Sequence, residues 1–551
     1  MSKEKGIILA SVQLAVMVIL SGALLAKGGL YIKQHEGDTL HLLQILLRMT
    51  DGQIPHLDFV TPIGILAFSP IVIFTKLGMG VGTAFLWGQV LVATVFFPAI
   101  WWVSHTRLKG VWRFVFSGAL MVLCLGLIHG ESNTAVSVSM HYNRWAWAAA
   151  FLAIVAAVLP NQNRSGQGQP VDGIVIGLAF SVMAMIKVTY FAAFLPAVLV
   201  ALFTRGAGKT VLWALLSGLI AVGLMTLYVG TPLFWLYYMS DLMNVAGSSV
   251  RPQPGLPFGD VVSAPAYLSG SLLGLIAVVF LRQSGQMREG LVLMLLLPGF
   301  FYVTFQNFGN DPQWVGILAI LLISLVPARP VYNGFGWDLQ RGILLAATVG
   351  FVLAMPSFIN IAQSPFRHLV TDTEEYVPVL VGVAGQEDLL TFDVRANRLD
   401  AKYAIDGPDT IFSAFYDEEM RKDQVKFLGE DLPWRSLDLG MIAWFRVIAD
   451  DLVASGVVDG KSMFVADLLP SYWMYGAGEP VKGAAPWYYG DLTGIENADL
   501  LLVPLFPLSV DVRKQILDEI TEQEWSSGIK ELRRTEYYIL YALPKTFDQK
   551  P

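Results

Sequence analysis

The chain of 551 residues is 54% hydrophobic, and only 15% of its residues are charged, well below the ~25% usual for soluble domains. Its net charge of −7 is unevenly divided, because residues 362–551, here called the tail, hold 18 Lys and Arg against 32 Asp and Glu. Such an acidic tail argues against nucleic acid as a partner. The single cysteine, Cys124, excludes a disulfide within the chain and is interpreted as a small buried hydrophobic residue.

Long apolar runs recur through the first two thirds of the chain, which is typical of a polytopic α-helical membrane protein. The first run resembles a signal peptide at its start, but it is too long and no clear cleavage site follows, so we interpret it as an uncleaved span. The sequence predicts about eleven spans, near residues 6–26, 83–103, 112–128, 145–160, 173–186, 190–203, 211–228, 264–281, 291–303, 314–326 and 342–359.

Lys and Arg in the short connections predict the orientation of these spans. Every second connection is basic, as in 105–113 and 161–164, and this set is expected in the cytoplasm. The polar loop 28–62 and the tail fall in the opposite set. This assignment requires that 63–74, an apolar stretch too short to cross comfortably, lies at the membrane interface.

The sequence therefore divides into a transmembrane domain, 1–361, and a tail long enough for one α/β domain outside the cytoplasm. Apolar or β-prone segments bounded by polar or Gly/Pro residues predict three buried strands in the tail, and longer patterned segments predict two helices. The predicted strands are 462–469, 499–503 and 535–542, and the predicted helices are 439–454 and 510–524.

The loop 28–62 is polar and charged although it lies between apolar segments, so we expect it to carry an active site. If residues 39–50 form a helix, Asp38 lies near its N-cap and shares one face with His41, Ile45 and Arg48, opposite a row of leucines. Such a helix would lie along the membrane surface with its polar side facing a cavity. Asp38 is the strongest catalytic candidate, and its structural alternative is a helix cap.

Two other acids of this loop are candidates for helper roles. Glu36 either tunes the pKa of Asp38 or binds a metal ion jointly with it, and otherwise is a solvated acid. Asp58 precedes the interfacial segment and is a further catalytic candidate, whereas Asp51, before Gly52, is interpreted as part of a turn. The alternative reading of Arg48 is a contact with lipid headgroups.

Basic residues on the outer side are not explained by the cytoplasmic charge bias. Lys187 interrupts two apolar runs and Arg144 opens a span, and both are candidates for gripping a phosphate at the bilayer boundary. The alternative for both is snorkelling to lipid headgroups. His141 and Asn143 beside Arg144, and Asp311 in another outer loop, are candidate substrate contacts or structural residues.

The segment EGDTLHLLQILLRMTDGQIPHLDFVTPIG, which begins at Glu36, resembles the first outer loop of the GT-C superfamily of membrane glycosyltransferases. Bacterial relatives of the protein mannosyltransferases and of the lipid A aminoarabinose transferases are the nearest comparison. The family pattern G-x-x-P-x-x-D-F is matched by Gly52, Pro55, Asp58 and Phe59. Two features depart from the family: Glu36-Gly37-Asp38 replaces paired acids, and TPIG replaces Lys-Pro-Pro, so the donor and acceptor are not identified.

The resemblance implies an inverting glycosyltransferase of the bacterial inner membrane that takes a sugar from a polyprenyl-phosphate donor on the periplasmic face. Asp38 would be the general base, and Lys187, Arg144 and Arg48 would bind the donor phosphate. The acceptor would be a lipid, a glycan or a protein, membrane lipids would surround the bundle, and a divalent metal is left open. The alternatives are a transporter or flippase of a lipid-linked glycan and a membrane scaffold with a periplasmic binding domain.

Overall fold

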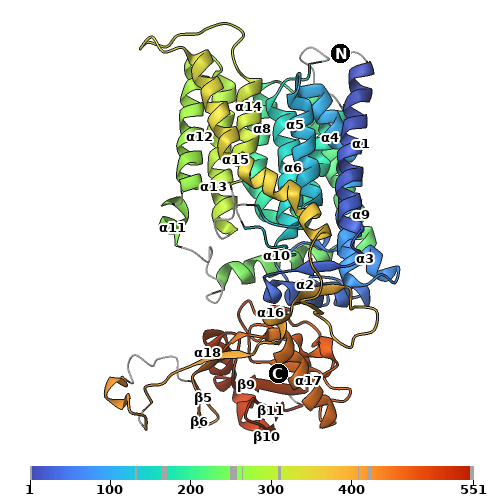
Figure 1. The fold of residues 1–551 in the computed structure, drawn as a ribbon, viewed down its shortest axis with the longest axis vertical. Coiled ribbons are helices and arrows are strands. Elements are labelled where there is room, and N and C mark those ends of the chain that lie inside the picture. The colour runs from blue at the N-terminus through green and yellow to red at the C-terminus, as the bar shows by residue number, and fades with distance from the viewer. Residues whose placement is uncertain are drawn as a thin grey trace.

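The computed structural model describes residues 3–130, 133–162, 170–248, 257–263, 265–307, 312–407, 409–417 and 425–545. Most of these residues are helical, and the helices form a bundle above a tail that contains a sheet (Figure 1). The chain begins at the end of the bundle farthest from the tail. A helical bundle followed by a sheet-containing region is therefore confirmed.

Five helices of the described chain are long and apolar enough to cross a membrane. They are α1 (Lys3–Leu25), α4 (Val81–Arg107), α9 (Gly208–Val229), α13 (Met287–Gln306) and α15 (Leu339–Leu369). The other predicted runs are also helical but shorter, and they form α5 (Trp112–Leu125), α6 (His141–Val158), α7 (Pro170–Ile186), α8 (Val188–Thr204), α12 (Pro265–Gln283) and α14 (Trp314–Ser324). That all of them cross the membrane stays a prediction.

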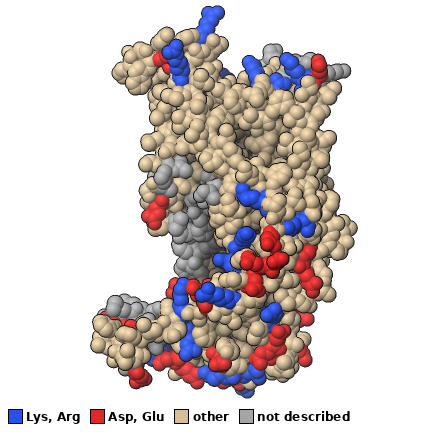
Figure 2. Space-filling view, viewed as in Figure 1, with Lys and Arg blue, Asp and Glu red and all other residues tan. Residues whose placement is uncertain are grey.

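The outside of the bundle is apolar, as lipid contact requires. On α9, Leu224 is 63% and Leu227 79% exposed, whereas α6 is buried along nearly its whole length. Figure 2 shows a broad uncharged band across the visible face of the upper bundle, with mainly Lys and Arg at the end where the chain begins. Exposed apolar surface of this extent suits a membrane rather than water, so these helices are compatible with a membrane protein.

The stretch 63–74 does not form a membrane-length helix. It contains a 3₁₀ turn at Ile65–Ala67 and then α3 (Ser69–Lys76). An eight-residue α-helix rises only roughly 12 Å, far less than the ~30 Å of a bilayer core. α3 lies at the lower end of the bundle beside the polar loop (Figure 1), as the interfacial interpretation expects.

The polar loop begins with β1 (Leu30–Ile32) and continues into α2 (Glu36–Thr50). The helix starts at Glu36, three residues before the predicted start at residue 39, so Asp38 is in its first turn and is not its N-cap. The N-cap is His35, which has a left-handed backbone with φ of 64° and makes no capping bond through its side chain. A lone histidine in this conformation gives no start signal that a sequence pattern would find.

The tail is joined to the bundle through this loop. β1 pairs in parallel with β3 (Leu389–Phe392), which also pairs with β2 (Tyr376–Pro378). Just before β3, Asp388 accepts hydrogen bonds from the backbone N–H groups of Gly82 and Thr83 at 3.0 and 2.7 Å, which caps the positive end of α4. A Cβ on Gly82 would lie 2.2 Å from the Asp388 carbonyl oxygen, so only glycine permits this approach.

The main tail sheet has the order β10-β11-β9-β8, with β8 parallel to β9 and the other pairs antiparallel. Its core strands β8 (Met463–Val465), β9 (Leu500–Pro504) and β11 (Tyr538–Ala542) lie within or close to the three predicted segments, and α17 (Met441–Ala454) and α18 (Val510–Thr521) match the predicted helices. Smaller elements are α11 (Phe258–Ser263), α16 (Asp393–Asn397), β4 (Asp400–Tyr403), β5 (Val425–Phe427), β6 (Glu430–Leu432), β7 (Arg435–Leu439) and β10 (Lys530–Arg534).

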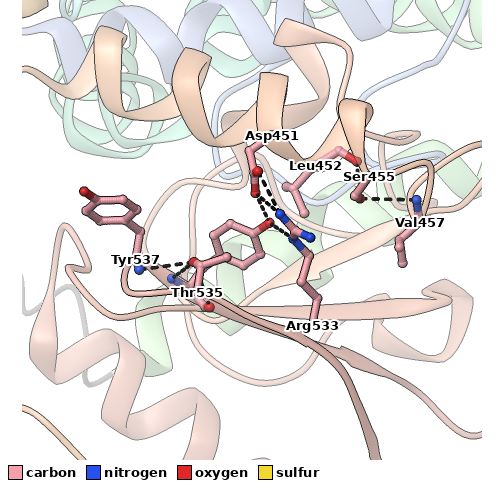
Figure 3. A network of polar contacts seen from close by, with 8 residues as sticks. Asp451, Leu452, Ser455, Val457, Arg533, Thr535 and Tyr537 are labelled. Carbon is pink, nitrogen blue, oxygen red and sulfur yellow. Dashed lines mark hydrogen bonds and ion pairs between the residues drawn. The ribbon is translucent and has the colours of Figure 1, made fainter.

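A polar network ties α17 to the edge of this sheet (Figure 3). Arg533 donates to both carboxylate oxygens of Asp451 at 2.8 and 3.0 Å, and the Tyr538 hydroxyl donates to the same carboxylate at 2.5 Å. These hydrogen bonds hold the pKa of Asp451 below its ordinary value, the bond from Tyr538 contributing most. The tail is thus fastened by its own ion pairs as well as by its apolar core.

Candidate functional site

Asp38 lies in the first turn of α2 against the segment that precedes α6. The Ser139 hydroxyl donates a hydrogen bond to its carboxylate, and the His35 ring nitrogen Nδ1 lies 2.9 Å from the Ser137 hydroxyl. Met140, which follows Ser139, has a left-handed backbone with φ of 50°. The two serines fasten this segment to the start of α2, and Ser139 orients the half-buried Asp38 carboxylate.

Glu36 is directed to the tail. Its carboxylate accepts two hydrogen bonds from the Arg395 guanidinium, at 2.5 and 2.7 Å, and one from the Thr391 hydroxyl at 3.2 Å. A bidentate pair of this kind is strong and geometrically specific. The structure therefore gives Glu36 a docking role between loop and tail, and its proposed help to Asp38 stays a prediction.

Asp58 shapes the far end of the loop. Its carboxylate accepts a hydrogen bond from the Ile54 N–H at 2.7 Å, which closes a turn, and its carbonyl accepts one from the Gly483 N–H of the tail at 2.9 Å. Asp51 is exposed and is the C-cap of α2, in line with the predicted turn.

Lys187 lies between α7 and α8, where it is the N-cap residue of α8. Its ammonium group donates a hydrogen bond to the Asn307 side-chain oxygen and lies 6.0 Å from the centre of the Tyr142 ring. It also lines a cavity of about 210 Å³, here called the bundle-side pocket. The lining residues are Pro62, Ile63, Met140, Tyr142, Lys187, Val188, Thr189, Leu242, Val245, Ala246, Tyr302, Gln306 and Asn307.

The segment 139–142 connects the two strongest candidates. Ser139 bonds Asp38, and Met140 and Tyr142 line the bundle-side pocket together with Lys187. Asp38 and Lys187 are 149 positions apart in the sequence, but both lie beside this one short segment at the lower end of the bundle. Sequence patterns gave no signal for Ser139 or Asn307, since serine and asparagine are common in loops.

Arg144 and its neighbours are buried deeper in the bundle. Arg144 is 1% exposed and donates to the carbonyl oxygens of Gly126 and Ile128 at 2.5 and 2.8 Å. Together with Asn143 it lines a separate cavity of only about 20 Å³. His141 lies 2.9 Å from the Ala67 carbonyl oxygen. These three side chains therefore do not line the bundle-side pocket, and their contact with substrate stays a prediction.

The polar face of α2 is covered by the tail and does not face an open cavity along its length. Ile45 is fully buried, the His41 ring nitrogen Nε2 lies 3.1 Å from the Tyr489 hydroxyl, and Gln44 donates to the Pro486 carbonyl at 2.8 Å. At the end of this face, Arg48 donates to the Val481 carbonyl at 3.1 Å. The predicted amphipathic helix is correct, but its polar side is a docking surface for the tail.

Arg48 lines a second cavity of about 400 Å³ between α2, α10 (Leu233–Gly247) and the tail, here called the tail-side pocket. The Arg48 side chain is 2% exposed, its Nε has no hydrogen-bond partner in the described structure, and burial lowers its pKa to about 10. Aromatic residues surround it, because its guanidinium lies 5.5 and 5.8 Å from the ring centres of Phe59 and Trp473.

Helix α10 separates the two pockets, and sequence reasoning did not single it out. Met243, Asn244 and Gly247 line the tail-side pocket, whereas residues between them line the bundle-side pocket. The helix is anchored by the buried Asp241, whose carboxylate lies 2.8 Å from His56 Nδ1 and accepts the Thr61 N–H at 3.1 Å. The sequence signal that could have identified this helix is Asp241 itself, because a carboxylate inside the apolar run FWLYYMSDLM needs a polar partner.

Other candidates stay untested. Asp311 lies outside the residues that the structure describes. Within the described ranges, no group of three His, Cys, Asp or Glu side chains is placed to hold a metal ion. No protein-family model matches the chain, and no significant similarity to a curated protein or to a solved structure is found.

Proposed function

We propose that this protein is an inverting glycosyltransferase of the GT-C kind, which moves a sugar from a polyprenyl-phosphate donor to an acceptor. The observation that carries the proposal is the convergence of Asp38 and Lys187 on the segment 139–142, where a pocket adjoins the lower end of an apolar bundle. A lipid-linked donor suits this place, because its chain stays among the apolar helices while its phosphate reaches a cation.

In the proposed reaction, an acceptor hydroxyl attacks the anomeric carbon of the donor sugar. The bond from that carbon to the phosphate oxygen breaks, and polyprenyl phosphate leaves with the electron pair. Asp38 takes the proton of the attacking hydroxyl, and such general bases typically contribute 10²–10⁴-fold. Lys187 stabilises the negative charge that grows on the leaving phosphate. Ser139 orients the Asp38 carboxylate and Asn307 orients the Lys187 ammonium group.

The site is placed on the periplasmic side of a bacterial inner membrane, with about eleven spans above it. The basic loops support this orientation, and Lys and Arg gather at the opposite end of the bundle (Figure 2). A reporter fused after Thr371 should be active only outside the cytoplasm. Activity inside the cytoplasm would place Asp38 on the wrong side and would contradict the span count.

The proposed reaction is tested with the purified chain and a panel of polyprenyl-phosphate sugars. We expect release of polyprenyl phosphate from one of these donors. Where that release depends on an added acceptor, the Asp38→Asn variant should lose it. A chain that folds and releases lipid phosphate from no member of a broad panel, with and without envelope acceptors, would contradict the proposal.

A further inference from the structure

The tail-side pocket holds a buried cation whose partners are incomplete. Arg48 is 2% exposed, and among the described residues its guanidinium has one hydrogen bond, to the Val481 carbonyl, with no partner for Nε. A buried guanidinium that meets one neutral oxygen and two aromatic rings, but no anion, is costly. A ligand with an anionic group would remove that cost, because Arg presents a planar fork that fits carboxylate or phosphate.

The acids of the same pocket do not serve as that partner. Burial raises the pKa of Asp467 to about 6. Its carboxylate accepts hydrogen bonds from the backbone N–H groups of Leu468, Leu508 and Ser509 at 2.8, 2.7 and 3.1 Å. Asp491 is exposed and accepts the Thr493 N–H at 2.8 Å. Both carboxylates are therefore occupied by the tail's own backbone, and no ion pair links either of them to Arg48 in the described chain.

The shape of the pocket indicates the rest of the ligand. Its volume, about 400 Å³, lies in the range of small-molecule sites. All of β8, the edge strand beside the parallel strand β9, lines it, together with Asp467 and Pro470 that follow the strand. Trp473, Tyr488 and Tyr489 line it, and such flat aromatic faces with a polar edge suit a sugar ring, which has apolar C–H faces and a polar rim.

We propose that the tail-side pocket binds a saccharide that carries a carboxylate or phosphate group, with Arg48 holding the anionic group and Trp473 packing against a sugar ring. Its assignment as the subsite for a distal part of the acceptor rests on the proposed function. Arg48 is ten residues from Asp38 along α2, or roughly 15 Å along the helix axis, and the tail covers the helix face between them. A hydroxyl that reacts at Asp38 therefore belongs to a different unit from the anionic group bound at Arg48.

The test measures binding of glucuronic acid and glucose 6-phosphate to the full chain in detergent, by calorimetry, with glucose and inorganic phosphate as comparison probes. We expect both anionic sugars to bind more tightly than glucose or phosphate alone. Arg48→Gln should weaken their binding by about 10-fold or more, the effect of losing a charged hydrogen bond. Lys482→Gln, which removes an exposed charge next to Val481, should leave binding unchanged.

A second variant covers the case in which Arg48→Gln fails to fold. Ala485→Trp fills the pocket from its half-buried wall and should abolish binding of both sugars without removing any Arg48 contact. Equal binding of glucose and glucuronic acid, equal binding of phosphate and glucose 6-phosphate, or binding unchanged in Ala485→Trp would each overturn the inference.

The two proposals fail separately. Release of polyprenyl phosphate by a chain that does not bind anionic sugars would refute the pocket assignment and leave the glycosyltransferase standing. Binding through Arg48 by a chain that releases no lipid phosphate from any donor would keep the saccharide site and refute the reaction.

Discussion

Buried cations of the bundle and of α2 are held differently from cations on the tail surface. Arg48 and Arg144 are almost fully buried, and their hydrogen bonds go to backbone carbonyl oxygens. On the tail, Arg533 meets the carboxylate of Asp451 (Figure 3), and Arg534 meets two glutamates. In the first arrangement no carboxylate neutralises the positive charge, whereas in the second every guanidinium is paired with at least one carboxylate.

This difference distinguishes residues that we expect to act on a substrate from residues that we expect to stabilise the fold. A buried charge among neutral groups lowers stability unless a ligand neutralises it, whereas a partly exposed ion pair such as Arg533–Asp451 adds a small amount of stability and lines neither pocket. We therefore expect substitutions beneath the bundle to change activity more than folding, and substitutions in the tail pairs to change folding more than activity. The following predictions test this division, from the largest effect to the smallest.

The largest effect is expected for Asp38→Asn. The amide keeps the size of the side chain and still accepts the Ser139 hydrogen bond, so α2 should survive, but the group that takes the proton is lost. Sugar transfer should fall by roughly 10²-fold or more, or about 2.7 kcal/mol, with donor binding within a few-fold. Steady-state transfer assays measure this.

Asp51→Asn is the matched control, because Asp51 is an exposed acid at the other end of the same helix. It should be nearly silent. Normal turnover by Asp38→Asn would refute the mechanism, and a larger loss for Asp58→Asn would keep the proposed reaction but move the base to Asp58.

The next effect is expected at Lys187. On the proposed function, Lys187→Ala removes the charge that would face the donor phosphate, so donor use should fall by roughly 10–100-fold, the value of a charged hydrogen bond. Thermal stability should change less, because the half-buried ammonium group lies at the pocket and bonds to the neutral side chain of Asn307. Arg533→Gln in the tail should show the reverse, with a lower melting temperature and unchanged donor dependence. An unaltered donor KM in a folded Lys187→Ala variant would make Lys187 a headgroup contact.

A smaller effect is expected at the boundary between the two regions, where Glu36 and Arg395 form a bidentate pair. Glu36→Gln and Arg395→Gln should each destabilise the docking of the tail, and the double variant should lose less than the sum, with a coupling of about 1 kcal/mol. Denaturation of the four chains measures this cycle. Additive losses, together with a transfer defect for Glu36→Gln alone, would instead favour direct help to Asp38.

The smallest effect is expected from Asp451. Its pKa is lowered in the folded chain, first by the Tyr538 hydrogen bond and then by Arg533, so its stabilising contribution is complete above the ordinary aspartate pKa of about 3.9. That contribution is lost as the pH falls through the lowered folded value. The melting temperatures of the parent chain and Asp451→Asn should differ at pH 6 and converge below pH 4.

Asp459→Asn, which changes an exposed acid shortly after α17, is the control and should show no such convergence. A difference between the parent chain and Asp451→Asn that is the same at pH 6 and pH 3 would show that the network of Figure 3 does not depend on the Asp451 charge.

The sequence by itself determined the elements that rest on local pattern. Apolar runs identified the bundle helices, the shortness of 63–74 together with the charge bias of the loops argued against a span there, and α17, α18 and the strands β8, β9 and β11 followed from composition and boundaries. These features are local because hydrogen bonding within a helix, or burial of a short strand, depends on neighbouring residues. The start of α2 at Glu36 escaped this reasoning, since His35 adopts a left-handed backbone that only its surroundings hold in place.

Only the tertiary structure decided the partners of the charged residues. The sequence marked Glu36, Asp38, Arg48 and Lys187 as unusual, but their contacts are Arg395, Ser139, Val481 and Asn307, each more than 100 positions away. A charge in an apolar setting must find a partner, and the type of residue announces that need. The partner that a charged residue finds depends on how distant helices and the tail pack together. That packing makes Glu36 a docking residue, leaves Asp38 as a candidate base, and places Arg48 in the wall of a pocket.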